Sequence, residues 1–381
     1  MTMMFTNIEF CDDATEENVV ELIERSISAD AKYIVVLIAS QSTVRIESIP
    51  NLAAVTSVPL NACIIPGVVY GNHYSYRGVL VIGFKDPITS LIIPNIAASH
   101  DVLCHQLQQF VADNGSFGSA FIFVDGLSHA VEPFIATVYE KLGSDRTLIG
   151  AGVGDIDNRF NMSIADVQGC FRNAAIIFCL SNSYKIQVVG KHDLPKIAGP
   201  YLVTEAYENV IHSLNYQPAV EIFSEAISLL SGIDITKENI NKYLHCYPFG
   251  LKQLDEEYLV RDIISVNENS LVCVGNVAEN SLVYILHATK EVLISAASDA
   301  GAQFAAKLSP NKTDKIRHVF LIDCISRAFH LQSDYQLELD AINNQFAGGN
   351  IIVGVLSIGE IKNSNQGAIQ FLNKTIVLGG M

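Results

Sequence analysis

Apolar and polar positions along the chain follow a helical period in some segments and form continuous apolar runs in others. In residues 15–28 the apolar side chains recur on one helical face, and Thr15 can cap the start. The uninterrupted apolar run from Tyr33 to Ala39 predicts a strand that is covered on both faces. The same two patterns predict further strands at 77–84, 119–124 and from 147, and helices at 102–111 and 131–142.

Beyond Gly154 the pattern changes to short apolar segments separated by turn residues. This pattern predicts successive strands of an antiparallel meander. The strands are expected at 162–167, 174–180, 184–189 and 200–206. A helix is expected at 218–230, because Pro218 suits a first helical turn and Gly232 suits a helix end.

The carboxyl-terminal part repeats this order of elements without repeating the sequence. Ser333-Asp334-Tyr335-Gln336 has the form of a capping box and predicts the start of a helix. Another helix is expected at 291–304, and strands at 258–265, 270–275, 281–287, 318–323, 351–356 and 375–378. The predicted fold class is therefore α/β, with a two-part mixed β-sheet architecture flanked by helices. The two interlocked parts are expected at 1–216 and 217–381.

Composition narrows the class of protein further. The chain has 381 residues, of which 49% are hydrophobic, and its net charge of −16 disfavours nucleic acid and anionic lipid as partners. No apolar run approaches the roughly 20 residues of a membrane-spanning helix, and Met1 to Glu9 lacks the features of a secretory signal. The eight Cys are scattered without zinc-like spacing. We therefore expect a cytoplasmic protein without membrane insertion, disulfide framework or metal.

Two sets of short motifs, far apart in the chain, carry a family resemblance. The first set is Asp125-Gly126-Leu127-Ser128 and the Gly-rich segment 150–155. The second is Asp323-Cys324 with Arg327, then Gly359-Glu360 and 373–375. In this order they resemble the FIST N and FIST C parts of the FIST sensory module. The chain departs from many relatives at 60–67, where the Cys of a Gly-Cys-Thr-Thr-Ala-Gly-Glu-like segment is displaced and the Glu is missing.

The resemblance implies a non-enzymatic sensor that binds a small ligand and regulates a signalling partner. The partner would be a histidine kinase or a cyclic-dinucleotide signalling enzyme. One branch of the family resembles a haem-binding sensor of nitric oxide, and other members are thought to bind metabolites such as amino acids. We expect the ligand in a pocket at or near the junction of the two parts.

In the first motif set, the candidate ligand-binding residues are Asp125, Gly150, Gly152 and Asp155. They follow buried strands, and the carboxyl ends of strands are where α/β sheets collect ligands. Asp125 could bind a ligand amine, or it could stabilise the turn while Ser128 caps the next helix. The Gly residues could let the backbone approach a ligand or turn tightly.

In the second motif set, the candidates are Asp323, Arg327 and Glu360. Arg327 could clamp a carboxylate with two hydrogen bonds, as an amino acid or a haem propionate would offer. The alternative is an internal pair with Asp323 that braces the turn. Glu360 could face a ligand amine or be an ordinary surface carboxylate.

Two further residues represent alternative chemistries. A haem cofactor would need an axial ligand, and His192 is the first choice because haem-binding relatives carry a similar His in a Gln-His-Phe-x-Pro-like stretch. His73 and His100 are the next choices, and the alternative is that His192, like most lone His residues, is no ligand at all. Cys324 could be the nucleophile of a cysteine-dependent enzyme if a base such as His330 lies beside it.

Overall fold

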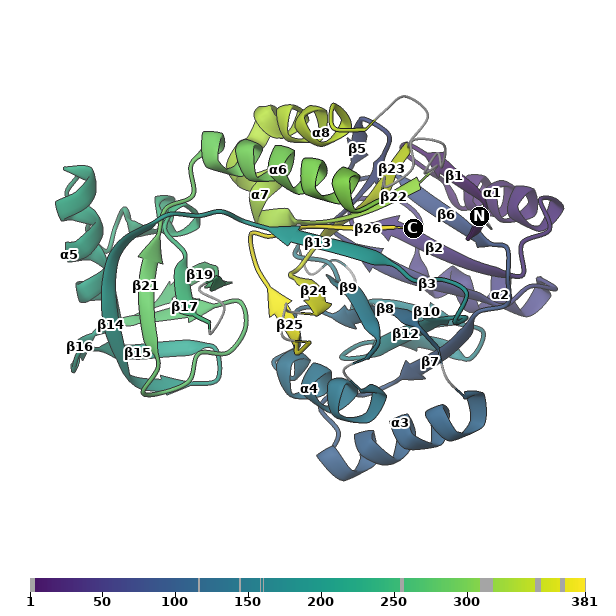
Figure 1. Cartoon of the computed structure of the whole chain (residues 1–381), viewed down its shortest axis with the longest axis horizontal. Helices are drawn as coiled ribbons and strands as arrows, with labels where there is room; N and C mark the ends of the chain where they lie inside the picture. Colours follow the sequence, from purple (N-terminus) through teal and green to yellow (C-terminus); the bar gives the residue numbers. More distant parts are fainter. Residues whose placement is uncertain are drawn as a thin grey trace.

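The computed structural model describes residues 4–115, 117–143, 145–157, 159, 161–253, 257–308, 318–346, 351–363 and 367–380. Three β-sheets and their helices form one body of the molecule (Figure 1). A fourth sheet lies beside this body at the left of Figure 1, together with α5 (Ala219–Ser231). We call the segment 196–287, which holds the fourth sheet and α5, the lateral unit.

Each sheet of the main body has six strands in the described part of the chain. Sheet 1 contains, in spatial order, β1 (Phe5–Cys11), β6 (Val79–Phe84), β2 (Tyr33–Ala39), β3 (Leu60–Ile65), β10 (Ile164–Asp166) and β11 (Gly169–Phe171). Sheet 2 contains β25 (Ile369–Leu372), β24 (Glu360–Asn363), β9 (Thr147–Val153), β8 (Ser119–Asp125), β12 (Ala175–Leu180) and β7 (Thr89–Ile93). Sheet 3 contains β13 (Gln187–Lys191), β26 (Ile376–Gly380), β22 (His318–Cys324), β23 (Ile351–Ser357), β4 (Gly67–Tyr70) and β5 (His73–Ser75).

The fourth sheet is antiparallel and belongs to the lateral unit. Its path is β18 (Tyr258–Arg261), β17 (Phe249–Lys252), β21 (Leu282–Leu286), β14 (Lys196–Tyr207), β15 (Val210–Leu214), β20 (Ser270–Cys273) and β19 (Ile263–Asn267), and β16 (Gln217–Pro218) pairs with β15. The short 3-10 helices η2 (Ile240–Lys242) and η3 (Leu244–Cys246) connect α5 to β17.

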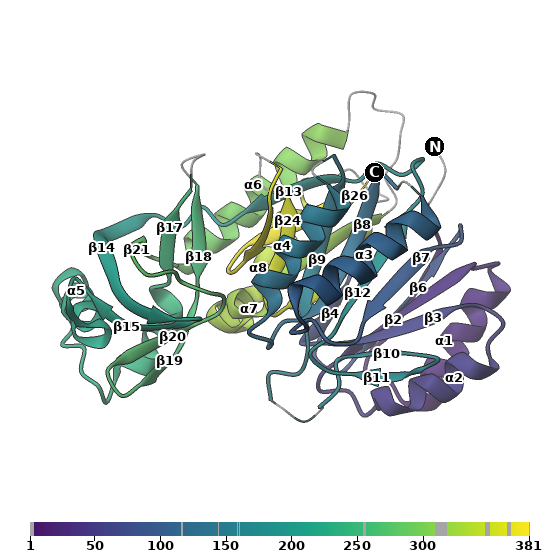
Figure 2. The ribbon, with the colours of Figure 1, turned by 90° about the horizontal axis from the view of Figure 1, so that it is seen from below.

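Helices cover the outer face of each sheet of the main body (Figures 1 and 2). Sheet 1 carries α1 (Glu16–Ser28) and α2 (Ile49–Val55), preceded by η1 (Ile46–Ser48). Sheet 2 carries α3 (His100–Asn114) and α4 (Val131–Leu142). Sheet 3 carries α6 (Lys290–Leu308), α7 (Ile325–Leu331) and α8 (Tyr335–Asn343), with η4 (Gln332–Asp334) between the last two.

The inner faces of the three sheets share one central core, which explains the continuous apolar runs. On β2, Val35 and Leu37 point into this core, whereas Ile34 and Val36 point towards α1 and α2. Since successive side chains of a strand face opposite sides, both sides need apolar residues when both are covered. A fully buried side chain of this size stabilises the fold by about 1.5–3 kcal/mol.

The three sheets are built on the same plan and exchange strands in a cycle. Each contains one parallel pair, namely β2–β3, β8–β9 or β22–β23. The next strand then leaves for another sheet: β4 pairs with β23, β10 with β3, and β24 with β9. The chain therefore crosses between sheets just after Ile65, Val153 and Ser357.

The structure confirms the α/β class, with mixed sheets flanked by helices. The predicted helix at 15–28 is α1, and Thr15 forms a capping box with Asn18. The predicted strand from Tyr33 to Ala39 is β2, and it is buried along its whole length. The domain division after residue 216 stays a prediction, and three of the four sheets combine strands from before and after it.

Two predictions of local structure are wrong. The strands after Gly154 form no meander, because β10, β12, β13 and β14 lie in four different sheets. Their short apolar segments gave no information on partners that come from distant parts of the chain. The capping box at Ser333 is also absent, since α8 begins after Asp334 and no side chain caps it.

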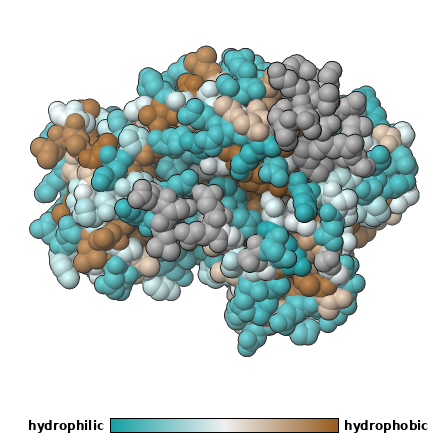
Figure 3. All heavy atoms as spheres, in the orientation of Figure 1, coloured by the Kyte–Doolittle hydropathy of each residue, from teal (hydrophilic) through white to brown (hydrophobic). Residues whose placement is uncertain are grey.

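The surface of the lateral unit exposes apolar side chains at the end of α5. Leu229 is 86% exposed, and Leu230 and Ile233 are also exposed. Figure 3 shows apolar side chains over this left-hand end of the molecule. In the described residues, no helix combines the length and apolarity needed to cross a membrane.

Candidate ligand-binding site

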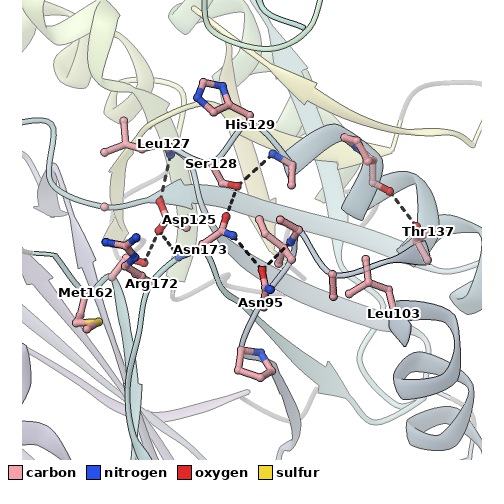
Figure 4. Close-up of a pocket in the computed structure, with 18 of the residues that line it drawn as sticks. Asn95, Leu103, Asp125, Leu127, Ser128, His129, Thr137, Met162, Arg172 and Asn173 are labelled. Atoms are coloured by element: carbon pink, nitrogen blue, oxygen red, sulfur yellow. Dashed lines mark hydrogen bonds between the residues drawn. The ribbon is translucent and has the colours of Figure 1, made fainter. Parts of the chain in front are cut away.

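An open groove of about 1080 Å³ lies at the carboxyl-terminal edge of β8 and β9. This edge meets the start of α4, and the groove is lined by Asp125 and Ser128 of the first motif set (Figure 4). Asp155 of the same set also lines it. Ligand pockets usually enclose about 300–1000 Å³, so the groove can admit a small metabolite. Its described lining residues lie between Pro94 and Glu208, within the predicted amino-terminal part.

Asp125 stabilises the loops around the groove by accepting hydrogen bonds from them. One carboxylate oxygen accepts a hydrogen bond from the backbone N–H of Leu127 at 3.2 Å. The other accepts from the backbone N–H of Asn173 at 2.7 Å and from the hydroxyl of Ser163 at 3.2 Å. The carboxylate thus stabilises the turn and remains half-buried at the groove surface, so it can still accept a bond from a ligand.

Ser128 and Asp155 are also bound to nearby backbone groups. The hydroxyl of Ser128 accepts from the N–H of Ala130, the residue that precedes α4. Asp155 is buried and accepts from the N–H groups of Asp157 and Arg159 at 3.0 and 2.6 Å. These contacts shape the two loops that form the groove walls.

Arg172 is a groove residue that the sequence did not single out. Its side chain is exposed and makes no hydrogen bond or ion pair with any described residue. It lies beside Asp125 and Met162 in Figure 4. A lone Arg between two short strands carries no recognisable motif, so only the fold reveals its position next to Asp125.

Gly150 and Gly152 have a different role from the acidic residues. Both lie within β9, and neither lines the groove. A Cβ at Gly150 would lie 1.9 Å from the carbonyl oxygen of Ile122, and one at Gly152 would lie 2.0 Å from that of Ile358. Gly150 therefore allows close contact with β8 in the same sheet, and Gly152 allows close contact with Ile358, where the chain crosses between sheets.

Asp323 and Arg327 lie away from the groove, in a buried ionic network. The guanidinium donates to both carboxylate oxygens of Glu338, at 3.0 and 2.7 Å, and to the carbonyl oxygens of Leu293 and Lys374. Asp323 lies 3.2 Å from Arg327 and accepts a hydrogen bond from the hydroxyl of Tyr335. Since Asp323, Arg327 and Glu338 are wholly buried, this geometry corresponds to the bracing alternative.

Glu360 is likewise enclosed rather than on the surface. Its carboxylate accepts from the hydroxyl of Ser357 at 2.6 Å and from the N–H of Thr375 at 3.1 Å. Burial raises the pKa of Glu360 to about 8. The alternative of an ordinary surface carboxylate is therefore wrong. The side chain helps to hold the chain in place at the end of β23.

His192 does not present a nitrogen suited to haem. Its Nε2 lies 2.9 Å from the carbonyl oxygen of Tyr258, and its Nδ1 accepts from the N–H of Leu194 at 3.1 Å. The adjoining cavity measures about 270 Å³. With both ring nitrogens in hydrogen bonds, His192 has no lone pair for iron, so the residues here do not fit the axial role.

Acid should weaken the fold through His192, because burial lowers its pKa to about 4. The unfolded chain has a His pKa near 6.5, so unfolding takes up a proton as pH falls from about 6.5 towards 4. Stability contributed by the neutral ring is present above this window and is lost within it, by up to about 1.4 kcal/mol per pH unit. Lys191 and Arg327 also lower the pKa, while Asp193 opposes them.

Urea unfolding of the wild-type protein and H192Q between pH 7 and pH 4 measures this effect. We expect H192Q to show a shallower acid dependence and H105Q, which changes an exposed His of α3, to keep the wild-type dependence. Equal slopes in all three proteins would contradict the assignment.

Cys324 lacks the surroundings of a catalytic thiol. Burial raises its pKa well above the usual value, and its sulfur lies 3.1 Å from the hydroxyl of Ser326. The suspected base His330 lies instead against Cys246 and His245. All eight cysteines are free thiols.

Comparison with protein families identifies the class. The FIST N domain matches residues 33–217, and the FIST C domain matches residues 219–363. The chain belongs to the FIST domain family, whose members are sensory modules that bind small ligands in signalling. A search of curated proteins found no match.

Proposed function

We propose that this protein is a sensor whose groove beside Asp125 and Arg172 binds a free amino acid. The observation that supports this proposal is the guanidinium of Arg172, which pairs with no described residue and lies beside Asp125. An amino acid carries a carboxylate for the first group and an ammonium for the second, and both hydrogen bonds would be charge-assisted. Leu127 and Met162 supply apolar surface for a side chain.

The position of the groove would allow a bound ligand to change the position of the lateral unit. Glu208, from the turn between β14 and β15, lines it, so the lateral unit contributes to its wall. Glu132 of α4, beside the groove residue Pro133, pairs with Arg261 of the lateral unit and accepts from the N–H of Asn276. A ligand that contacts α4 and Glu208 together would favour one position of the lateral unit over others.

This change would alter binding to a signalling partner. A histidine kinase or a cyclic-dinucleotide signalling enzyme is the proposed class of partner, in keeping with the signalling role of FIST modules. The conformational response requires that the ligand bind one state more tightly than the other.

Isothermal titration with individual L-amino acids tests the site. We expect R172Q to weaken binding about 10- to 100-fold, because a hydrogen bond to a charged group contributes about 1.5–3 kcal/mol. Arg172 is exposed and makes no hydrogen bond or ion pair with any described residue, so its removal should change the stability of the fold little.

R45Q is the matched control, because Arg45 is an exposed Arg that lines none of the described pockets. It should bind like the wild-type protein. If no amino acid binds, or if R172Q and R45Q bind equally well, the proposed site is wrong. An absorption spectrum after addition of haemin tests the haem hypothesis separately, since absence of a Soret band would remove it.

A further inference from the structure

Three potential metal ligands meet where the lateral unit contacts the main body. His245 and Cys246 belong to η3 of the lateral unit, and His330 lies on α7. One ligand atom from each lies within 4.8 Å of the others. The two His rings meet edge to face, with centroids 5.3 Å apart. His330 is 84 positions from Cys246, which is why no local spacing in the sequence predicted the group.

The spacing of the three atoms is close to that of a metal site. Bond lengths of about 2.0–2.1 Å to His and 2.3 Å to Cys place tetrahedral zinc ligands roughly 3.3–3.7 Å apart. The sulfur of Cys246 lies 4.0 Å from Nδ1 of His330. A shift of less than about 1 Å in side-chain position would therefore bring all three to bonding distance.

The ring nitrogens of His245 and His330 differ from those of His192, both of which take part in hydrogen bonds. Neither His245 nor His330 has a hydrogen bond to a nitrogen or oxygen atom of any described residue. His245 is exposed, so solvent can reach a fourth coordination position. Two cations lie near the group, and each pairs with an acid: Lys374 with Asp262 at 3.2 Å and Lys290 with Asp334 at 2.5 Å.

We propose that His245, Cys246 and His330 bind a thiophilic divalent metal ion of the zinc type. A Cys with two His residues suits zinc, and three protein ligands leave an open fourth position. Such an ion would join η3 to α7 and so fasten the lateral unit to the main body. This site is separate from the amino-acid groove and does not depend on its function.

A second group, His100, Cys104 and Glu140, is less suited to a metal. Nδ1 of His100 lies 3.3 Å from the hydroxyl of Thr137, and its Nε2 lies 3.3 Å from the sulfur of Cys104. Glu140 pairs with Lys141 at 2.6 Å. A metal would have to displace Lys141 from Glu140, and this second group provides the control for the experiment.

Metal binding is tested on the full chain after chelator treatment, with a reductant present. Zn²⁺ is titrated against a chromophoric chelator, and Co²⁺ is used to report thiolate ligation by its absorption. We expect one Zn²⁺ per chain and a cobalt–thiolate band. H245Q, H330Q and C246S should each bind Zn²⁺ at least about 100-fold more weakly, because even groups that merely orient a ligand contribute 10- to 100-fold.

The controls are H100Q in the second group and H105Q, an exposed His outside both groups; both should bind like the wild-type protein. H245Q changes an exposed ring, so it keeps the test decisive if the more buried variants fold poorly. The proposal is wrong if the wild-type protein binds no Zn²⁺. It is equally wrong if H245Q and C246S retain wild-type affinity, or if H100Q abolishes binding.

Discussion

Replacing Arg327 with Met is expected to destabilise the protein by about 3–5 kcal/mol. The guanidinium is wholly buried and neutralises Asp323 and Glu338, which are buried as well. Removing it would leave carboxylates in a low-dielectric interior without their cation. A typical domain has about 5–15 kcal/mol of stability in total, so this loss would be a large share of it. Equilibrium unfolding in urea measures the change.

R77A serves as the control for this variant. Arg77 also pairs with an Asp, at 2.7 Å, but both side chains are more than half exposed to solvent. Exposed pairs contribute about 0–1 kcal/mol, so R77A should remain close to the wild-type stability. The double variant R327M/E338L should recover part of the loss, because it removes charge of both signs. A loss below about 1 kcal/mol in R327M would show that the network is not a structural brace.

Replacing Gly150 with Ala is expected to destabilise the fold by about 3 kcal/mol, at the upper end of the range for overpacking. The new methyl group would lie 1.9 Å from the carbonyl oxygen of Ile122 on β8. Backbone on the neighbouring strand cannot rotate away as a side chain can, so β8 and β9 would have to separate. Thermal and urea unfolding would show the loss without any ligand.

Gly118 provides the matched control, because a Cβ there would meet no described atom closer than 3.5 Å. G118A should therefore change stability by less than about 1 kcal/mol. If G150A is as stable as G118A but fails to bind ligand, Gly150 has a binding role and the structural explanation is wrong.

The helices and buried strands could be predicted because each carries its pattern within a short segment. Helix α4 and strand β2 occur at the predicted positions, since an amphipathic stripe and a continuous apolar run depend only on near neighbours. The cyclic exchange of strands could not be predicted. β4, β10 and β24 are short, and their sequences do not show which distant strand they join.

The candidate site was predictable only in part, for a similar reason. Asp125 and Asp155 lie in the groove because both follow parallel strands of one sheet, which the motif positions indicated. Arg327 also follows a buried strand as a charged residue, yet it is buried and pairs with Glu338 of α8. A local motif shows that a charge is present, and the tertiary fold decides whether it faces solvent or a partner.

The amino-acid sequence by itself determined the α/β class, most helices and buried strands, and the FIST family, because these depend on local periodicity and on ordered motifs. The tertiary structure alone decided that three sheets share one core and that Arg172 lies beside Asp125. It also decided that His330 meets His245 and Cys246. These features arise from contacts between distant segments, which depend on how buried surfaces fit together and leave no periodic signal along the chain.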